Sequence, residues 1–309
     1  MADRPRVSVV VLSHARPALL EQTLRSLALQ TWTDCETLVV DNASDASAAV
    51  REVVAAFPEA RLVASPVNLG YAGGMNLGWR AAAGEHVFLT EDDIVLAPDC
   101  VERLLVFAAD RLGCGVTAPL MLNRGTGTIR CAGLRISLGP VYRQTVLGAD
   151  EPDDGRFATP TSVEAVPGAA IFVRRDLLER LGGFREDFFL YYEDVEFCLR
   201  VRGEGLTNWV EPSARVWHHE PVVRPSPLTT FHMQKNLYAL YALHAPGTVL
   251  PEFALRYVVA ETVRALVREP ARARRNALAA LWVLRRLPTL LADRRRNRLA
   301  ATPKLSGDS

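Results

Sequence analysis

The stretch HVFLTEDDI (residues 86–94) joins an apolar run to three consecutive carboxylates, Glu91, Asp92 and Asp93. A short continuous apolar run of this kind is typical of a strand that is buried on both faces of a sheet. Carboxylates that lie side by side away from water repel one another, and a hard divalent cation such as Mg²⁺ or Mn²⁺ relieves that repulsion. The stretch therefore predicts a strand that ends at a metal site. The alternative is that the carboxylates only favour the N-terminus of a helix in APDCVERLLVF (97–107).

Three further apolar runs precede this strand, and helical patterns lie between them. Because the runs are continuous rather than alternating, they indicate an α/β fold with a mostly parallel sheet flanked by helices. Ligands of such sheets bind beyond the carboxyl ends of the strands, and a second strand also ends in a carboxylate, Asp41 in VVDNASD (39–45). The runs are VSVVVLS (7–13), ETLVVD (36–41) and RLVAS (61–65), and the helical patterns cover residues 17–30, 46–57 and 73–83.

A glycine-rich segment, NLGYAGGMNLGW (68–79), lies between the third and fourth runs. Its glycines either let the backbone approach a ligand closely or serve tight turns and helix packing. The residues of the segment leave both interpretations open.

Length and cysteine usage limit the class of protein. A chain of 309 residues with 49% hydrophobic content can bury a sizeable core. Its five cysteines are scattered without any CxxC spacing, which favours neither a disulfide framework nor a zinc site. No stretch offers about 18 uninterrupted apolar residues for a membrane span. We expect a cytoplasmic protein, or one that lies peripherally on the inner face of the cell membrane, without a nucleic-acid partner.

Charge is distributed unevenly along the chain. Residues 251–309 carry 13 Arg and Lys against 5 Asp and Glu, or +8, which leaves 23 minus 30, or −7, for residues 1–250. Apolar residues recur between the arginines at roughly helical spacing, which predicts amphipathic helices broken at Pro270 and Pro288. The basic faces of these helices either pack on the acidic body, or form a homodimer contact, or rest on anionic lipid.

Five segments, read together, resemble a known family. They are VSVVVLSHARPALLEQTLRSL (7–27), VVDNASD (39–45), NLGYAGGMNLG (68–78), FLTEDDIVLAPD (88–99) and GGFREDFFLYYEDVEFCLR (182–200). In this order they closely resemble the family 2 glycosyltransferases, particularly bacterial rhamnosyltransferase-like members. The resemblance covers residues 7 to about 240 and implies a GT-A fold, a nucleotide-diphosphate-sugar donor, a divalent metal (Mg²⁺ or Mn²⁺) and inversion at the anomeric carbon.

The resemblance also implies roles for single residues. Asp41 would contact the base of the donor, Asp92 its ribose, and Asp93 the metal that bridges both phosphates. Glu91 stands where members have Asn or Asp and is a further candidate ligand. Many members have Asn where Ala15 stands, so no side-chain contact is carried over to that position. The remaining candidate donor-binding residues are Ser13, His14, Asn68, Gly70, Gly74 and Asn76.

Sugar transfer needs a base that takes the proton from the acceptor hydroxyl as it attacks. In this family the base is the Asp of a Glu-Asp motif at the start of a helix, and YYEDVEFCLR (191–200) offers Glu193 and Asp194. Asp194 is the predicted base, and Glu193 is the next candidate. Without the resemblance, these carboxylates would simply favour a helix N-terminus. The turn at 167–169 resembles the acceptor side of the family's site.

Two adjacent histidines in ARVWHHEP (214–221) follow a predicted short strand. The family often has a metal-binding histidine at this point, which makes His218 a candidate ligand ahead of His219. A histidine without such support is more often structural.

The resemblance divides the chain into a GT-A catalytic domain (1–245) and a basic amphipathic helical tail (246–309). Within the catalytic domain, a nucleotide-sugar-binding half (about 1–120) precedes an acceptor half (about 121–245). The predicted acceptor is a hydroxyl of a glycan, a lipid-linked sugar or a small molecule, and the sugar is rhamnose on family grounds alone. The alternative function is a non-catalytic nucleotide-sugar-binding homologue or a sugar nucleotidyltransferase, although the loop after the first strand lacks the glycines expected of the latter.

Overall fold

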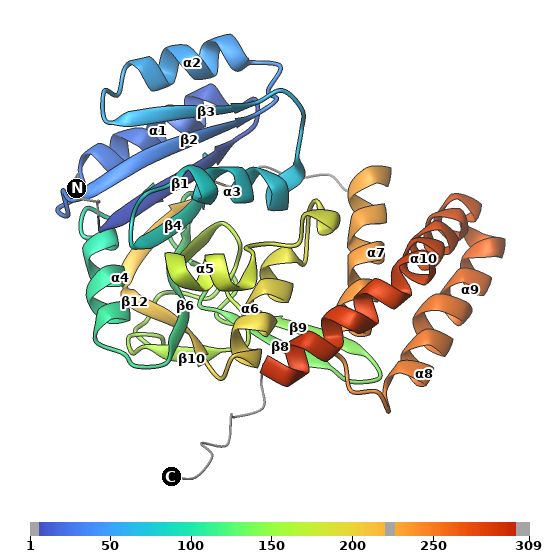
Figure 1. Cartoon of the computed structure of the whole chain (residues 1–309). Coiled ribbons are helices and arrows are strands. Elements are labelled where there is room, and N and C mark those ends of the chain that lie inside the picture. The colour runs from blue at the N-terminus through green and yellow to red at the C-terminus, as the bar shows by residue number, and fades with distance from the viewer. Residues whose placement is uncertain (1–5, 220–225, 301–309) are drawn as a thin grey trace, which may run out of the picture.

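The computed structural model describes residues 6–219 and 226–300, with the side chains of 298–300 left out. The first part of the chain forms a parallel α/β unit, drawn in blue and teal in Figure 1. Its elements are β1 (Val7–Ser13), α1 (Pro17–Ala28), β2 (Cys35–Asn42), α2 (Ser47–Ala55), β3 (Ala60–Ser65), α3 (Gly70–Ala81) and β4 (His86–Glu91). The four strands pair in the order β3-β2-β1-β4 and all run parallel. β1 is buried at every position, as a continuous apolar run predicts.

The direction of the strand order reverses at β1. From β1 the chain moves to β2 and β3 on one side, and it then returns to place β4 on the other side. Right-handed crossovers therefore put α1 and α2 on one face of the sheet and α3 on the opposite face. The glycines of α3 allow close packing there, since a Cβ atom at Gly74 would overlap Leu12 and one at Gly78 would overlap Val10. Open α/β sheets bind ligands beyond the strand ends at such a reversal.

The second part of the chain extends the same sheet beyond β4. Its elements are β5 (Ile94–Leu96), α4 (Cys100–Ala109), β6 (Cys114–Asn123), β7 (Ile129–Cys131), β8 (Leu134–Leu138), β9 (Tyr142–Val146), β10 (Thr161–Val163), β11 (Ala170–Arg174), α5 (Arg175–Leu181), η1 (Glu186–Phe188), α6 (Glu193–Gly203) and β12 (Thr207–His218). β11 pairs antiparallel with both β4 and β6, and β12 lies parallel to β6. The sheet is therefore mixed in this part, while the predicted α/β fold with a mostly parallel nucleotide-binding sheet is confirmed. The exposed segment 148–160 connects β9 to β10.

α7 (Pro227–His244) follows the sheet, and the helical C-terminal tail packs against it. The elements of the tail are α8 (Leu250–Phe253), the π-helical η2 (Ala254–Ala260), α9 (Glu261–Arg268) and α10 (Pro270–Ala300). In Figure 1, α10 crosses beside α7 at the end of the molecule away from β3. Leu290 of α10 is fully buried against Leu243 of α7. Arg294 is also buried and donates to the carbonyl oxygen of Ala242, at 2.9 Å, near the end of α7.

The predicted helix break at Pro270 is confirmed, but the one at Pro288 is wrong. α9 ends at Arg268 and α10 begins at Pro270, a position where proline costs no helical hydrogen bond. Pro288 lies inside α10, which continues through it. Proline removes one backbone donor from a helix, and the burial of Leu290 and Arg294 on the far side of Pro288 offsets that loss.

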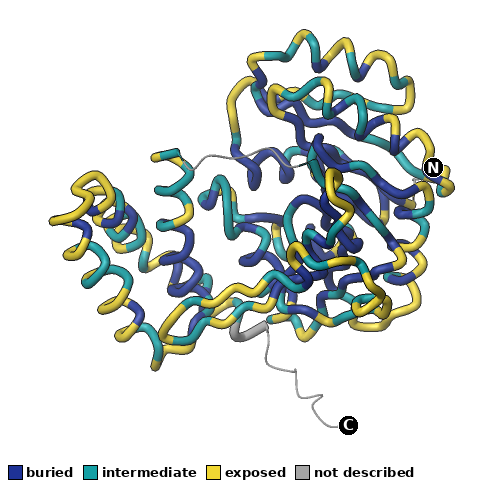
Figure 2. The backbone as a smooth tube through the Cα atoms, turned by 180° about the vertical axis from the view of Figure 1, so that it is seen from behind, coloured by how far each residue is buried: buried dark blue, intermediate teal, exposed yellow. Residues whose placement is uncertain are grey.

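The tail also exposes apolar side chains. Figure 2 shows many exposed residues along these helices. They include Val267, which is 88% exposed, and Leu284, which is 64% exposed. None of the helices in the described part of the chain is both long enough and apolar enough to cross a membrane.

Candidate active site

The ends of three neighbouring strands bring the predicted site residues together. Parallel pairing sets Ser13 at the end of β1 beside Asp41 of β2, and sets Leu12 beside Glu91 of β4. Asp92 and Asp93 form the turn that follows β4. The backbone N–H of Asp92 donates to the carbonyl oxygen of Leu12, at 3.1 Å. The carboxylate run that follows HVFLT therefore lies at the edge of the sheet where the strand order reverses.

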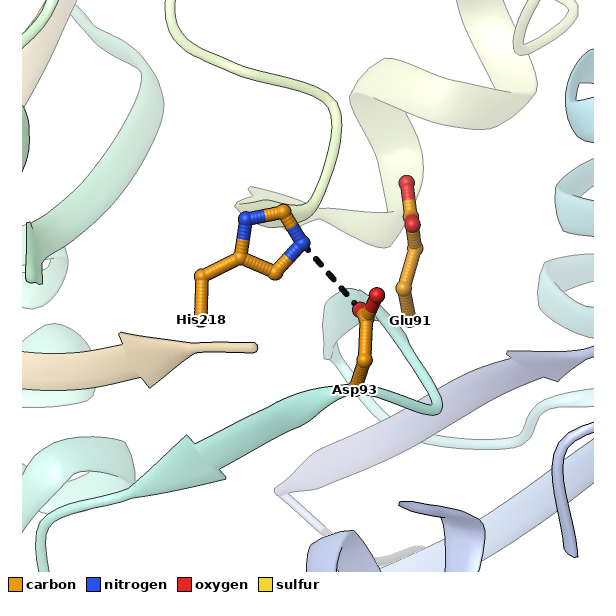
Figure 3. A group of neighbouring side chains, drawn as sticks. All are labelled: Glu91, Asp93 and His218. Atoms are coloured by element: carbon orange, nitrogen blue, oxygen red, sulfur yellow. Dashed lines mark ion pairs between the residues drawn. The ribbon is translucent and has the colours of Figure 1, made fainter. Parts of the chain in front are cut away.

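Glu91, Asp93 and His218 form a group that fits a metal ion. One possible ligand atom from each lies within 4.8 Å of the others, and Figure 3 shows the three side chains turned toward a common point. Antiparallel pairing of β12 with β5 sets His218 opposite Ile94, next to Asp93. The imidazole Nε2 of His218 lies 3.2 Å from Asp93 Oδ1. Two carboxylates and an imidazole suit a divalent cation, and the imidazole nitrogen favours Mn²⁺ over Mg²⁺, which prefers oxygen ligands.

Arg16, which the sequence analysis did not single out, forms ion pairs with the same carboxylates. It contacts Asp92, lies 2.5 Å from Asp93 and reaches within 4.0 Å of Glu91. Arg16 is the residue directly before α1, so its position is fixed by the turn that joins β1 to that helix. The sequence shows only a basic residue just after the first strand, and nothing in it indicates that this side chain turns toward the carboxylates.

Burial and mutual repulsion shift the pKa values of these carboxyl groups. Burial and the charge of Asp93 raise the pKa of Glu91 to about 8. Burial also raises the pKa of Asp92 to about 6, despite the charge of Arg16. Burial alone would raise the pKa of Asp93, but the hydrogen bond and charge of His218 and the charge of Arg16 outweigh it and lower that pKa. The acidic side chains of the site therefore outnumber the basic ones that could neutralise them. A bound metal ion would relieve the repulsion between them.

The predicted base lies at the N-terminus of α6, where two backbone groups hold its carboxylate. Asp194 accepts hydrogen bonds from the N–H of Gly168, at 2.9 Å, and from the N–H of Val195, at 2.7 Å. Burial raises the pKa of Asp194, although both hydrogen bonds oppose that effect. The hydroxyl of Tyr71 donates to the carbonyl oxygen of Gly168, which ties this turn to α3. The predicted acceptor-side turn at 167–169 thus lies directly against Asp194.

Glu193 differs from its neighbour because its side chain is nearly fully buried, at 4% exposed. Its Oε2 atom has no hydrogen-bond partner among the described residues. Burial and the charge of Asp194 raise the pKa of Glu193 well above its ordinary value. Because its carboxyl group is buried, Glu193 is a weaker candidate for the base than Asp194.

Several predicted donor-binding residues are engaged with the protein itself. Asp41 accepts hydrogen bonds from the N–H of Ser44, at 3.0 Å, and from the hydroxyl of Ser47. Asn76 holds the backbone of Phe184 through both its amide oxygen and its amide nitrogen. These contacts position the loops of the site, and a contact of either residue with the donor stays a prediction.

The glycine-rich segment follows the end of β3. Asn68 accepts a hydrogen bond from the N–H of Gly70, at 2.8 Å, at the start of α3. Gly70 has a φ of 68°, and a Cβ atom there would collide with the carbonyl of Phe189, so close approach of the backbone requires this glycine. Gly74, one turn later, packs on Leu12. These contacts support the interpretation that the glycines serve tight turns and helix packing, and approach of their backbone to a ligand stays a prediction.

The turn after β1 is built around Asp92. The backbone N–H of His14 donates to Asp92 Oδ2, at 3.2 Å, and the His14 ring nitrogen lies 3.1 Å from the carbonyl oxygen of Asn42. Ala15 adopts a φ of 60°, in the left-handed region that asparagine tolerates better than alanine. Alanine is therefore strained at this position, and glycine or asparagine would adopt its backbone conformation more readily.

Comparisons with known proteins agree with this geometry. A family model described as "Glycosyl transferase family 2" matches residues 8–182, more than half of the 309 residues. An N-acetylglucosaminyl-diphospho-decaprenol L-rhamnosyltransferase of Mycobacterium tuberculosis is 28% identical over 232 residues, which are 69% of this chain and 75% of the relative. An uncharacterised protein y4gI of Sinorhizobium fredii is 28% identical over 233 residues, but the chain spans only 25% of its length.

Among solved structures, the chain resembles a mannosyltransferase of Pyrobaculum calidifontis in complex with GDP-Man and Mn²⁺. The TM-score is 0.56 at 22% sequence identity, over 97% of this chain and 86% of the other. At this level of identity the likeness concerns the fold. The family match and the sheet together confirm the resemblance read from the five segments: the chain belongs to glycosyltransferase family 2 and has the GT-A fold.

Proposed function

We propose that this protein is an inverting, metal-dependent glycosyltransferase that moves a sugar from a nucleotide-diphosphate sugar to an acceptor hydroxyl. One observation carries the proposal. The candidate base on α6 lies near the strand end that carries the candidate metal ligands. The hydroxyl of Thr90, the residue before Glu91, donates to the carbonyl oxygen of Ala169, and the N–H of the neighbouring Gly168 donates to Asp194, both at 2.9 Å. A metal-held diphosphate and an acceptor hydroxyl therefore have neighbouring places to bind.

The proposed reaction is a single displacement. The acceptor oxygen attacks the anomeric carbon while the bond from that carbon to the diphosphate oxygen breaks, which inverts the anomeric configuration. Asp194 takes the proton of the acceptor hydroxyl, and two backbone N–H groups fix its carboxylate for that purpose. When bound, a divalent cation held by Asp93, Glu91 and His218 would offset the negative charge that grows on the leaving diphosphate.

The relatives suggest the substrates. The Mycobacterium tuberculosis relative is named as an L-rhamnosyltransferase that acts on a lipid-diphosphate-linked sugar. We propose by analogy that this chain takes an activated deoxyhexose or hexose and a lipid-linked acceptor. The base of the donor is left to experiment, because the donor-side loops hold no residue pattern that selects one.

The first experiment identifies the donor and then separates binding from chemistry. Thermal stabilisation by UDP, GDP or dTDP with Mn²⁺ identifies the base, and consumption of the matching nucleotide sugars identifies the donor. The Asp194→Asn variant should then keep its affinity for the nucleotide diphosphate while sugar transfer falls by at least about 10²-fold. If the variant instead loses donor affinity and transfers normally at saturating donor, Asp194 is not the base.

The basic tail is proposed to contact an anionic membrane surface, where a lipid-linked acceptor resides. Its residues 251–309 carry a net charge of +8, 13 minus 5. Val267, Leu266 and Leu284 are exposed among these charges, at 88%, 60% and 64%. Exposed apolar side chains beside arginines are typical of helices that lie in a membrane interface.

Flotation of the full-length protein with vesicles that contain anionic lipid tests this contact. We expect salt-sensitive association that weakens in a Val267→Ser, Leu284→Ser double variant. Leu112→Ser is the matched control, because Leu112 is fully exposed on the catalytic body, between α4 and β6. Absence of association at low salt refutes the proposal, and a double variant that instead dissociates a dimer assigns the face to a second copy of the chain.

A further inference from the structure

The segment immediately before the catalytic helix has an unfavourable backbone conformation. Phe189, Tyr191 and Tyr192 have φ values of 65°, 71° and 66°, all of them positive. Each such residue other than glycine costs about 1–2 kcal/mol. Conformations of this kind persist only where the surrounding structure holds them in place. α6 begins at the very next residue, so the segment 188–192 sets where Glu193 and Asp194 lie.

Two consecutive residues of α7 hold this segment by its carbonyl groups. The side-chain nitrogen of Asn236, which is fully buried, lies 2.8 Å, 2.9 Å and 2.7 Å from the carbonyl oxygens of Phe188, Leu190 and Tyr191. The ammonium group of Lys235 donates to the carbonyl oxygen of Asp187. Four carbonyl groups between residues 187 and 191 thus meet donors from one turn of a helix that lies elsewhere in the sequence.

The opposite side of the segment rests on the donor half of the fold. The N–H of Ala72 donates to the carbonyl oxygen of Phe189, at 3.2 Å. The same carbonyl is the group that a side chain at Gly70 would strike. The segment 188–192 is therefore clamped between α3, at the donor side, and α7.

Lys235 is placed at an energetic cost that an ordinary core residue would avoid. Its side chain is 3% exposed, and burial lowers its pKa to about 8. The ammonium nitrogen lies 4.5 Å from the ring centroid of Trp282 in α10, a cation–π distance. A leucine would fill such a position without the desolvation penalty. The presence of a lysine there indicates that its hydrogen bond to the carbonyl of Asp187 is needed.

We propose that Lys235 and Asn236 are positioning residues, which fix the segment 188–192 and thereby aim Asp194 at the acceptor hydroxyl. The inference rests on the proposed role of Asp194 as the base. A displacement of about 1 Å in a reacting group can cost about 10²-fold in rate, so the loss of this support should reduce turnover rather than donor binding. The residues that hold the metal and the nucleotide lie on other elements.

The test replaces the amide of Asn236 by a carboxyl group of the same shape, which offers at most one donor in place of two. Asn236→Asp should lower the kcat for release of nucleotide from the nucleotide sugar by at least about 10-fold. The affinity for the matching nucleotide diphosphate with Mn²⁺, measured by calorimetry, should stay within about twofold. Hydrogen exchange of the backbone over residues 188–195 should become faster.

Gln30→Glu is the matched control, because Gln30 is buried and its amide also donates to two backbone carbonyls, those of Ser26 and Ala97. It should lower the melting temperature to a similar extent without the loss of kcat. If Asn236→Asp fails to fold, Lys235→Met keeps an apolar stem and removes the ammonium group, with its hydrogen bond to Asp187 and its cation–π contact with Trp282. It should still lower kcat with donor affinity retained.

The outcomes separate this inference from the proposed function. If Asp194→Asn abolishes turnover while both α7 variants keep wild-type kcat, the positioning role is wrong and the assignment of the base stands. If Asp194→Asn keeps turnover, the proposed base itself is wrong. If Asn236→Asp and Gln30→Glu lose activity only in proportion to their unfolded fractions, Asn236 is merely structural.

Discussion

Arg16 occupies the space between the carboxylates assigned to the metal, so its removal should change how the site binds a bare cation. The guanidinium lies 2.5 Å from Asp93 and 4.0 Å from Glu91. A cation held by the same oxygens meets the positive charge of Arg16 at short range. Arg16→Met keeps a similar apolar stem and removes that charge.

The size of the effect follows from Coulomb's law. Two unit charges 4 Å apart interact by about 4 kcal/mol at an effective dielectric constant of about 20. The side chain of Arg16 is 30% exposed, so water screens part of this energy and the charge can partly move away. A net gain of about 1.4 kcal/mol is a conservative expectation, which is about a tenfold tighter affinity for Mn²⁺ alone.

Calorimetric titration of Mn²⁺ into the nucleotide-free protein measures this affinity directly. Arg25→Met is the control, since Arg25 lies on α1, the helix that follows Arg16, but pairs with Glu21 at the surface. Thermal unfolding should show a second effect. The variant without metal should be less stable than the wild type, because three carboxylates lose their counter-ion, and Mn²⁺ should restore more of its stability. Equal or weaker binding of Mn²⁺ to Arg16→Met would show that the guanidinium does not compete with the cation.

Three further predictions follow from single residues. Asp93→Ala should abolish the Mn²⁺-dependent part of the affinity for the nucleotide diphosphate, and calorimetry that shows unchanged metal dependence contradicts the assignment. Ala15→Gly should stabilise the protein by about 0.5–1 kcal/mol, or about 2 °C in melting temperature, because glycine adopts the φ of 60° at Ala15 without strain; a lower melting temperature argues against this. Burial raises the pKa of Glu196, but Arg200 and His244 outweigh it and lower that pKa to about 2. The ionised Glu196 therefore contributes its full share of the free energy of unfolding above about pH 4.5, and this share disappears as the pH falls toward 2. The wild type should lose about 3 kcal/mol of unfolding free energy over that range through this group, and Glu196→Gln should show a flatter acid dependence; equal slopes for both proteins refute the assignment.

The strands and the acidic edge of the sheet could be predicted because their signals are local. HVFLTEDDI reports burial and charge within nine residues. The order of the strands, which depends on long-range pairing, was not predicted. The contact of Asp93 with His218 has no local signal in the sequence, because it depends on the pairing of β5 with β12. Only the resemblance to a family suggested that contact before the structure showed it.

The contacts of Arg16 and Asn236 could not be predicted, for a physical reason. Arg16 reaches the carboxylates because Ala15 turns the chain through a left-handed conformation, and alanine gives no sign of that turn. Asn236 sits within a largely apolar helix stretch, LYALYALH (237–244) following directly. An isolated amide in such a helix reads as a neutral helix residue, and its partners are carbonyl groups, which no sequence pattern marks.

Composition sets residues 246–309 apart as a basic tail, but contacts in the structure connect this tail to the catalytic helix. α10 supports α7 through Arg294, and its Trp282 lies against Lys235, one of the two residues that hold the segment before Asp194. Deletion of the tail after residue 245 would remove both contacts together with the basic surface. A loss of activity in such a deletion would then say nothing about membranes. Substitutions of exposed residues such as Val267 and Leu284 leave those internal contacts in place, so only they can separate a tail that binds lipid from a tail that keeps the catalytic helix in position.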